Sequence, residues 1–505
     1  MGDMMKYGYV RELNAILLDK YNENEYGLTF VDYYMFQITS FGLSLFRELN
    51  LDNQRISLSQ AFDVRCIIEA LAVLRMYDKE EMPEYASDLL RSNQFICEYR
   101  TYKKYPKLHG ITFDLEEMER NYNDAVSYYR EKIGTDISSK DFKKIIKGKL
   151  PHLMEDYSYY SLISMYCPEF VDTYQHLSVI LHPSEIVTNF CYLEIESVID
   201  ILGKIFDAIT ELIEKYYPNI IPSYEHNWEY ECEYCFGDGT NYSPLVIAGK
   251  PQLMLIKELT LKIHEDLKLP DGEVCLPEVF FGRVYEELES ILYDKAFGFS
   301  EIIKSKVKPI FELFATFHYS LKQGEGSLIL DLMQYYTIIN YLKVKNEPFE
   351  DELNKSYEIY KKQFNSEITL DKYTDLITKN FMPVYLGYED IKGFVFEMID
   401  DLVIDILHQK DSCKMLYEES QCLSHGNGYV LSSNVGAFLD SDSACKSIDV
   451  LLLALFKEYA EIVKKNNLPK KLKYDIKSLL KKYEIIHTTI LYEELTLKPL
   501  IKKLG

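Results

Sequence analysis

Apolar residues recur every three or four positions along most of this chain, and this spacing constrains its fold more than any other feature. The stretches 62–74, 195–213 and 448–462 each place their apolar side chains on one face of a helix. Sustained alternation of apolar and polar residues, the pattern of a half-buried strand, does not occur between the turn signals. The sequence therefore predicts an all-α protein.

The charge balance limits the partners that such a protein can have. Asp and Glu number 80 against 56 Lys and Arg, which gives a formal charge of −24. This excess disfavours nonspecific attraction to nucleic acid or to an anionic membrane. The ten cysteines lack the spacing of a disulfide framework, and no stretch reaches the ~20 apolar residues of a bilayer span. We therefore expect a cytoplasmic protein that does not cross a membrane.

Two segments that lie 243 residues apart share a Tyr-x7-His pattern. Tyr174 and His182 in the first segment align without a gap on Tyr417 and His425 in the second. Another match, between residues 67–71 and 338–342, has an offset of 271, so the second copy would lack 28 residues between the two landmarks. The sequence predicts two tandem, related helical bundles that pack about a pseudo-twofold axis, as homodimeric bundles do.

These landmarks divide the chain into four segments. We expect a first helical repeat at 1–217, a linker at 218–251 that is rich in Pro and Gly, and a degenerate second repeat at 252–465. The last segment, 466–505, is predicted to be a basic helical tail, because from Phe456 onwards twelve Lys face six acidic residues. The tail is expected either to dock on the acidic body or to hold an anionic partner, nucleic acid included.

The repeated Tyr and His are the first candidates for a functional site. Residues eight apart on a helix border the same face, and Pro183 ends the helix just after His182. A His at a helix C-terminus is favoured in its protonated form, which suits either a general acid or an ordinary helix cap. Four further residues complete the candidate binding set: Ser178 and Ser184 in the first copy, and Tyr417 and His425 in the second.

An earlier helix adds Arg65 and Glu69, four residues apart. With Tyr174, His182-Pro183-Ser184 and a closing amphipathic helix, they resemble a group of bacterial domains of unknown function that is similar in layout to the HEPN-like helical bundles. The resemblance covers about 50–215 and, in the second copy, about 325–465. It implies an up-and-down bundle, often dimeric, of the kind found in prokaryotic defence or toxin systems. The ribonuclease members carry an Arg shortly before the His, whereas residues 175–178 of this chain contain none.

Arg65 is therefore the residue that would supply the missing guanidinium from another helix. In this interpretation Arg65 and Glu69 face His182 and Tyr174 across the bundle, and the four form a catalytic site. The simpler alternative is an ion pair within one helix. At the offset of 271, the matching positions in the second copy are the uncharged Tyr336 and Asn340. The site is thus predicted in the first copy only.

A separate candidate is a metal site in the linker. Cys232 and Cys235 have the Cys-x2-Cys spacing of half a structural zinc site, and His226 precedes them. A complete site needs four ligands, and Cys275 is the next cysteine along the chain. Zinc binding and plain thiols both stay open, and no other cofactor is expected.

The sequence predicts a cytoplasmic helical binding or interaction protein with a role in prokaryotic defence or regulation. Its expected partner is another protein or a second copy of itself. The alternative is an RNA- or nucleotide-directed enzyme with its site in the first repeat. Nucleic acid is expected to bind only at that repeat or at the basic tail.

Overall fold

The computed structural model describes most of the chain as helices joined by short connections. The described residues are 2–23, 28–48, 58–79, 99, 103–105, 115–133, 159–181, 195–220, 244–268, 275–296, 300–323, 328–379, 387–404, 408–423, 441–466 and 468–482. Within these ranges there are helices and turns but no strand, so the all-α prediction is confirmed. None of the described helices is both long enough and apolar enough to cross a bilayer.

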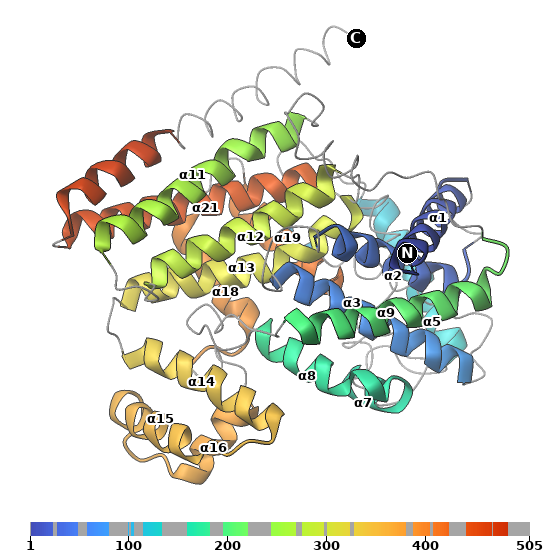
Figure 1. The fold of residues 1–505 in the computed structure, drawn as a ribbon, viewed down its shortest axis with the longest axis horizontal. Helices are drawn as coiled ribbons and strands as arrows, with labels where there is room; N and C mark the ends of the chain where they lie inside the picture. The colour runs from blue at the N-terminus through green and yellow to red at the C-terminus, as the bar shows by residue number, and fades with distance from the viewer. Residues whose placement is uncertain are drawn as a thin grey trace, which may run out of the picture.

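The N-terminal part of the chain forms one group of helices (Figure 1). Its members are α1 Gly2–Glu23, α2 Phe30–Glu48, α3 Leu58–Lys79, α5 Leu115–Ile133, α7 Tyr159–Tyr166, the 3-10 helix η2 Pro168–Phe170, α8 Val171–Ile180 and α9 Ile195–Tyr216. Helix α1 packs on α2 and α9, and α2 packs on α3. Helix α3 then contacts α7, α8 and α9, so it is the centre of this group.

A second group follows in the C-terminal part of the chain. It comprises α11 Pro244–Leu267, α12 Leu276–Ala296, α13 Ser300–Gln323, α18 Ile391–Leu402, α19 Gln409–Leu423 and α21 Ser441–Lys465. Helix α11 packs on α12, and α12 on α13. Helix α13 also contacts α18, α19 and α21, which makes it the centre of the second group. Because α11 begins at Pro244, the predicted linker 218–251 extends too far, and residues 244–251 are helix.

Three helices form a smaller lobe at the edge of the second group (Figure 1). They are α14 Leu328–Lys345, α15 Glu350–Gln363 and α16 Leu370–Lys379. The lobe has its own small apolar cluster, in which Leu332, Met333, Ile339, Tyr373 and Ile377 are fully buried. Helix α14 also packs on α8, and this contact joins the lobe to the first group.

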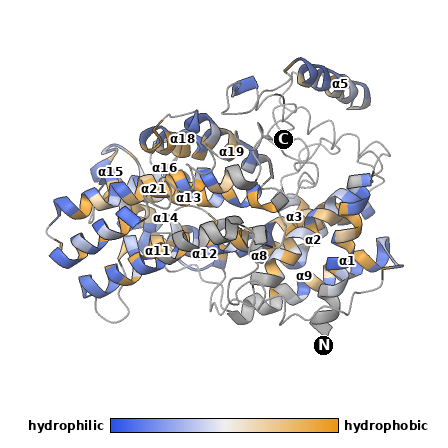
Figure 2. Ribbon diagram, turned by 90° about the horizontal axis from the view of Figure 1, so that it is seen from above, coloured by the Kyte–Doolittle hydropathy of each residue, from blue (hydrophilic) through white to orange (hydrophobic). Residues whose placement is uncertain are grey.

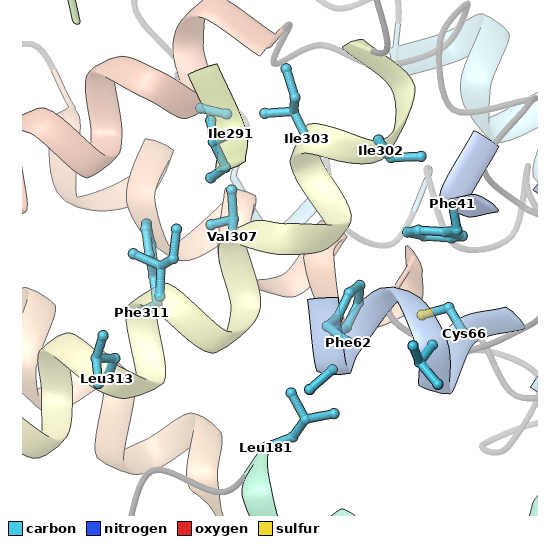
Figure 3. Close-up of a cluster of buried hydrophobic side chains, with 14 of the residues drawn as sticks. Phe41, Phe62, Cys66, Leu181, Ile291, Ile302, Ile303, Val307, Phe311 and Leu313 are labelled. Atoms are coloured by element: carbon cyan, nitrogen blue, oxygen red, sulfur yellow. The ribbon is translucent and has the colours of Figure 1, made fainter. Parts of the chain in front are cut away.

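A single large hydrophobic core runs through both groups of helices. Helices α2, α3 and α13 are rich in apolar residues, whereas α5 and α15 at the periphery are mostly hydrophilic (Figure 2). Figure 3 shows the centre of this core, where Phe62 and Cys66 of α3 lie close to Val307 and Phe311 of α13. The two central helices therefore meet in the middle of the molecule.

The N-terminus of α2 is fixed by a capping box. The backbone N–H of Thr29 donates to Asp32 Oδ2 at 2.7 Å, and the backbone N–H of Asp32 donates to Thr29 Oγ1 at 3.2 Å. Lys20 and Tyr217 donate to the same carboxylate, at 2.6 and 2.7 Å. Burial alone would raise the pKa of Asp32, but these hydrogen bonds outweigh it and hold the pKa below its usual value. The network thus joins α1, α2 and the end of α9.

The described part of the basic tail is a helix that docks on α11. Residues 470–482 are helical, and Leu472, Ile476 and Leu479 on this helix are buried in the main core. Lys471 pairs with Asp266 and Lys482 with Glu258, both on α11, at 2.9 and 3.4 Å. Residues 468–482 therefore dock on the acidic body, which was the first of the two roles expected for the tail.

Candidate functional site

Three of the four predicted catalytic residues form one buried cluster in the first group of helices. Glu69 lies on α3 with none of its side chain exposed. Tyr174 on α8 donates its hydroxyl hydrogen to Glu69 Oε1 at 2.8 Å, and Arg65 Nε donates to the same oxygen at 3.1 Å. The guanidinium carbon of Arg65 is also 5.6 Å from the centre of the Tyr174 ring. The ion pair within α3 and the contact across the bundle are therefore both present.

Burial and charge together set the protonation states in this cluster. Burial raises the pKa of Tyr174, and the neighbouring Glu69 raises it further, so the tyrosine stays a hydrogen-bond donor. Burial opposes the charge on Arg65, but Glu69 and Tyr174 more than compensate and hold its pKa above the usual value. The cluster is thus a fixed cation beside a carboxyl that accepts two hydrogen bonds.

The other predicted site residues are only partly covered by the structure. Ser178 is on α8, where its hydroxyl donates to the carbonyl oxygen of Tyr174 at 2.8 Å, so it supports the helix rather than the cluster. Six others lie outside the described residues: His182, Ser184, His425, and the zinc candidates His226, Cys232 and Cys235. Among the described residues, no group of three His, Cys, Asp or Glu could hold a metal ion.

A second cluster with the same chemistry occurs in the second group of helices. Tyr417 on α19 donates to Glu312 Oε1 on α13 at 2.9 Å, and both side chains are buried. Lys308 stands one helical turn before Glu312, as Arg65 stands before Glu69. The Tyr417 ring also stacks on Phe311, with 6.2 Å between ring centres.

The Glu312 carboxyl has a perturbed proton affinity. Burial raises its pKa, and the attractions of Lys308, Tyr417 and Arg65 only partly oppose this effect. The charge of Arg65 thus reaches from α3 to a carboxyl on α13. The charge of Lys308 likewise acts on Cys66 of α3, whose pKa is raised mainly by burial. The two clusters are electrostatic neighbours.

The predicted match for the second copy was therefore wrong. Tyr336 and Asn340 lie on α14, and Asn340 donates to the carbonyl oxygens of Tyr336 and Ile377 inside the peripheral lobe. Glu312 contacts Tyr417 as Glu69 contacts Tyr174, and Lys308 stands four residues before Glu312 as Arg65 stands before Glu69. We had predicted a charged site only in the first copy, and this prediction is corrected at the same time.

The sequence contained a signal that would have found Lys308 and Glu312. Tyr174 and Glu69 are 105 residues apart, and Tyr417 and Glu312 are 105 residues apart as well. The offset of 243 between the two Tyr-x7-His segments therefore also relates the two carboxyls. The short apolar match at an offset of 271 was misleading, because runs of Ile and Leu recur in any helical core.

Comparison with known proteins gives no relative: no family model, no curated protein and no solved structure matches this chain.

Proposed function

We propose that this chain is a cytoplasmic binding protein that holds an anionic group of its ligand at Arg65. One observation carries the proposal: Arg65 Nε is anchored on the buried Glu69, while 16% of the Arg65 side chain stays exposed. A guanidinium has five N–H donors in a planar fork. Anchoring through Nε keeps the guanidinium in place, and the N–H groups of such a fork are suited to bind a carboxylate or a phosphate.

The charge of the whole chain favours a small ligand over a polymer. A formal charge of −24 repels a long polyanion over its whole length. A small anion meets Arg65 and Lys308 near the junction of α3 and α13, where Glu312 resists ionisation. We therefore favour a nucleotide or another small phosphate-bearing molecule over nonspecific binding of nucleic acid.

The cellular setting rests on two further arguments. The resemblance to HEPN-like bundles supports a role in prokaryotic defence or regulation. Two of the described cysteines, Cys167 and Cys413, are buried and form no disulfide, as is usual in a reducing cytoplasm.

The test is a binding measurement on Arg65 variants. A panel of nucleoside mono-, di- and triphosphates, with inorganic phosphate alongside, is titrated into the full chain by calorimetry. For any member that binds, Arg65→Met should raise Kd about tenfold or more, because a hydrogen bond to a charged group contributes about 1.5–3 kcal/mol. Arg65→Lys keeps the charge but loses the fork, and should fall between.

Arg75→Met is the matched control. Arg75 lies on the same helix and pairs with Glu169, away from the cluster. Its loss should leave Kd unchanged even if the protein becomes less stable. The proposal fails if no phosphate-bearing probe binds, or if Arg65→Met and Arg75→Met bind equally well.

The second candidate is an enzyme that acts on RNA or on a nucleotide. It is favoured by the meeting of Arg65, Glu69 and Tyr174, three of the four residues predicted to carry catalysis. In this case binding is followed by turnover of the probe. His182→Ala should then abolish turnover and leave Kd nearly unchanged, whereas a pure binding protein shows no turnover at all.

A further inference from the structure

The main helices of the two groups correspond when residue numbers are shifted by 243. Shifted in this way, α1 and α3 become residues 245–266 and 301–322. The observed α11 and α13 agree with these ranges to within one residue at each end. Helix α8 shifts onto the C-terminal part of α19, and α9 overlaps most of α21. The same shift thus relates helices at both ends of a stretch of more than 200 residues, whereas α7 shifts to 402–409, beyond most of α18.

Buried positions recur at the same shift. Four pairs of core residues are buried in both groups: Leu13 and Ile256, Ile67 and Ile310, Ile205 and Ile448, and Leu212 and Leu455. The neighbours recur too, because α2 packs on α3 as α12 packs on α13, and α3 meets α8 and α9 as α13 meets α19 and α21. Each group thus repeats the packing of the other.

The contact between the groups has the form of a twofold interface. In such an interface, only residues on the axis touch their own equivalents. Asp63 and Lys306 are equivalent at the shift of 243, and their Oδ2 and Nζ atoms are 3.0 Å apart. Contacts beside them are reciprocal: α3 meets α12 through Ser59 and Ser290, and α13 meets α2 where Lys306 donates to Ser44.

The charges on this axis differ between the two groups. Asp63 is fully buried and Lys306 is 1% exposed, and Lys306 also pairs with the buried Asp294 at 2.7 Å. Buried charges are tolerated when paired and are strongly unfavourable when they face a like charge. A pairing of two first halves would bury Asp63 against Asp63, and a pairing of two second halves would bury Lys306 against Lys306.

We propose that helices α2–α3 and α12–α13 form an internal dimer interface about a local twofold axis at Asp63 and Lys306, and that the opposite charges there restrict pairing to unlike halves. The face that a homodimer of either half would use is occupied within the chain itself. Each half therefore pairs with the other half of the chain, and the like charges at the axis disfavour pairing with a second copy of the same half.

The first test is a charge exchange in the full-length chain. Asp63→Lys and Lys306→Asp each place like charges on the axis, so each should lower the midpoint of thermal unfolding. The double variant restores opposite charges at 63 and 306, so it should be more stable than the weaker single variant and stay monomeric, although it places a carboxylate at 306 beside Asp294. The proposal is overturned if the double variant is no more stable than the weaker single variant.

The second test removes the charges. In Asp63→Asn/Lys306→Met/Asp294→Asn the charges at the axis no longer oppose pairing of like halves, so refolding at high protein concentration should yield a dimer. Light scattering should show this dimer for the neutral variant and a monomer for the natural chain. Lys20→Met is the control, because it breaks an ion pair with Asp32 away from the axis. A neutral variant that folds and stays monomeric at every concentration contradicts the pairing rule.

Discussion

Glu69 and Glu312 receive the same hydrogen bond from a tyrosine but differ in what balances their charge. Arg65 is bonded directly to Glu69. The nearest cation on the helix of Glu312 is Lys308, which acts on it only through space, so burial dominates and the pKa of Glu312 is raised. One cluster contains an ion pair, and in the other burial raises the pKa of the carboxyl.

This difference predicts a pH effect on stability at a single residue. A raised pKa in the folded state means that folded Glu312 holds its proton above pH 4.5, where the unfolded chain has lost it. Stability should therefore fall as pH rises from about 4.5 through the folded pKa. Glu312→Gln keeps an oxygen for Tyr417 and should remove this fall.

Urea unfolding of the natural chain and of Glu312→Gln between pH 4 and 8 measures the effect. The difference in stability should move in favour of Gln as pH rises. Glu358→Gln, at an exposed position on α15, should run parallel to the natural chain. Parallel curves for Glu312→Gln would mean that this carboxyl ionises normally in the folded protein.

Sequence reasoning succeeded at this scale where a residue's partner is close by or on a marked helix. Arg65 and Glu69 were expected to pair because they are four apart on one helix, and Tyr174 because it precedes a His in a repeated pattern. Lys308 and Glu312 were missed, since nothing local distinguishes one charged pair on an apolar helix from many others. The signal that identifies Glu312 is its sequence separation of 105 residues from Tyr417, the same as that between Glu69 and Tyr174.

At the scale of elements, periodicity was a sufficient guide. The stretches 62–74, 195–213 and 448–462 lie in α3, α9 and α21. The helix at 470–482 needed more than charge to be placed. Its lysines left two roles open, whereas the burial of Leu472, Ile476 and Leu479 in the main core shows that residues 468–482 dock on the protein itself. The buried apolar residues decide where this helix lies, and a count of its lysines does not reveal them.

A pair of variants separates these two contributions to docking. Leu472→Ala should lower the free energy of unfolding by about 2–5 kcal/mol, because it leaves a cavity under the helix. Lys471→Ala should change it little, because the Lys471 side chain is 69% exposed and water screens its pair with Asp266. Equal losses in urea titrations of the two variants would show that ion pairs rather than apolar contacts hold this helix.

At the scale of the whole molecule, one continuous core joins the two groups of helices, which the sequence predicts as separate repeats. Residues of α3 and α13 belong to one hydrophobic cluster, while α14–α16 have a cluster of their own. The offset of 243 predicted two related parts, but the depth of their contact depends on which faces meet, and an amphipathic pattern marks a face as buried without naming its partner.

The two clusters predict an order of unfolding. Amides of α3 and α13 should lose protection from hydrogen exchange at the same urea concentration, because one core supports both helices. Amides of α15 and α16 should exchange at lower urea, since their apolar cluster is much smaller. Mass spectrometry of exchange along a urea series resolves these segments. Separate transitions for α3 and α13 would show that the halves unfold independently.

The hydrogen bonds around Asp32 show what tethering two similar halves permits. In a true homodimer every substitution changes both subunits at once, so an improvement in one place is constrained by its effect in the other. Here the positions that correspond to Lys20, Asp32 and Tyr217 are Ile263, Cys275 and Ala460, which cannot form that network. In the internal dimer that we propose, each half can therefore have contacts of its own: the first has this polar network at α2, and the second has a helix that covers α11.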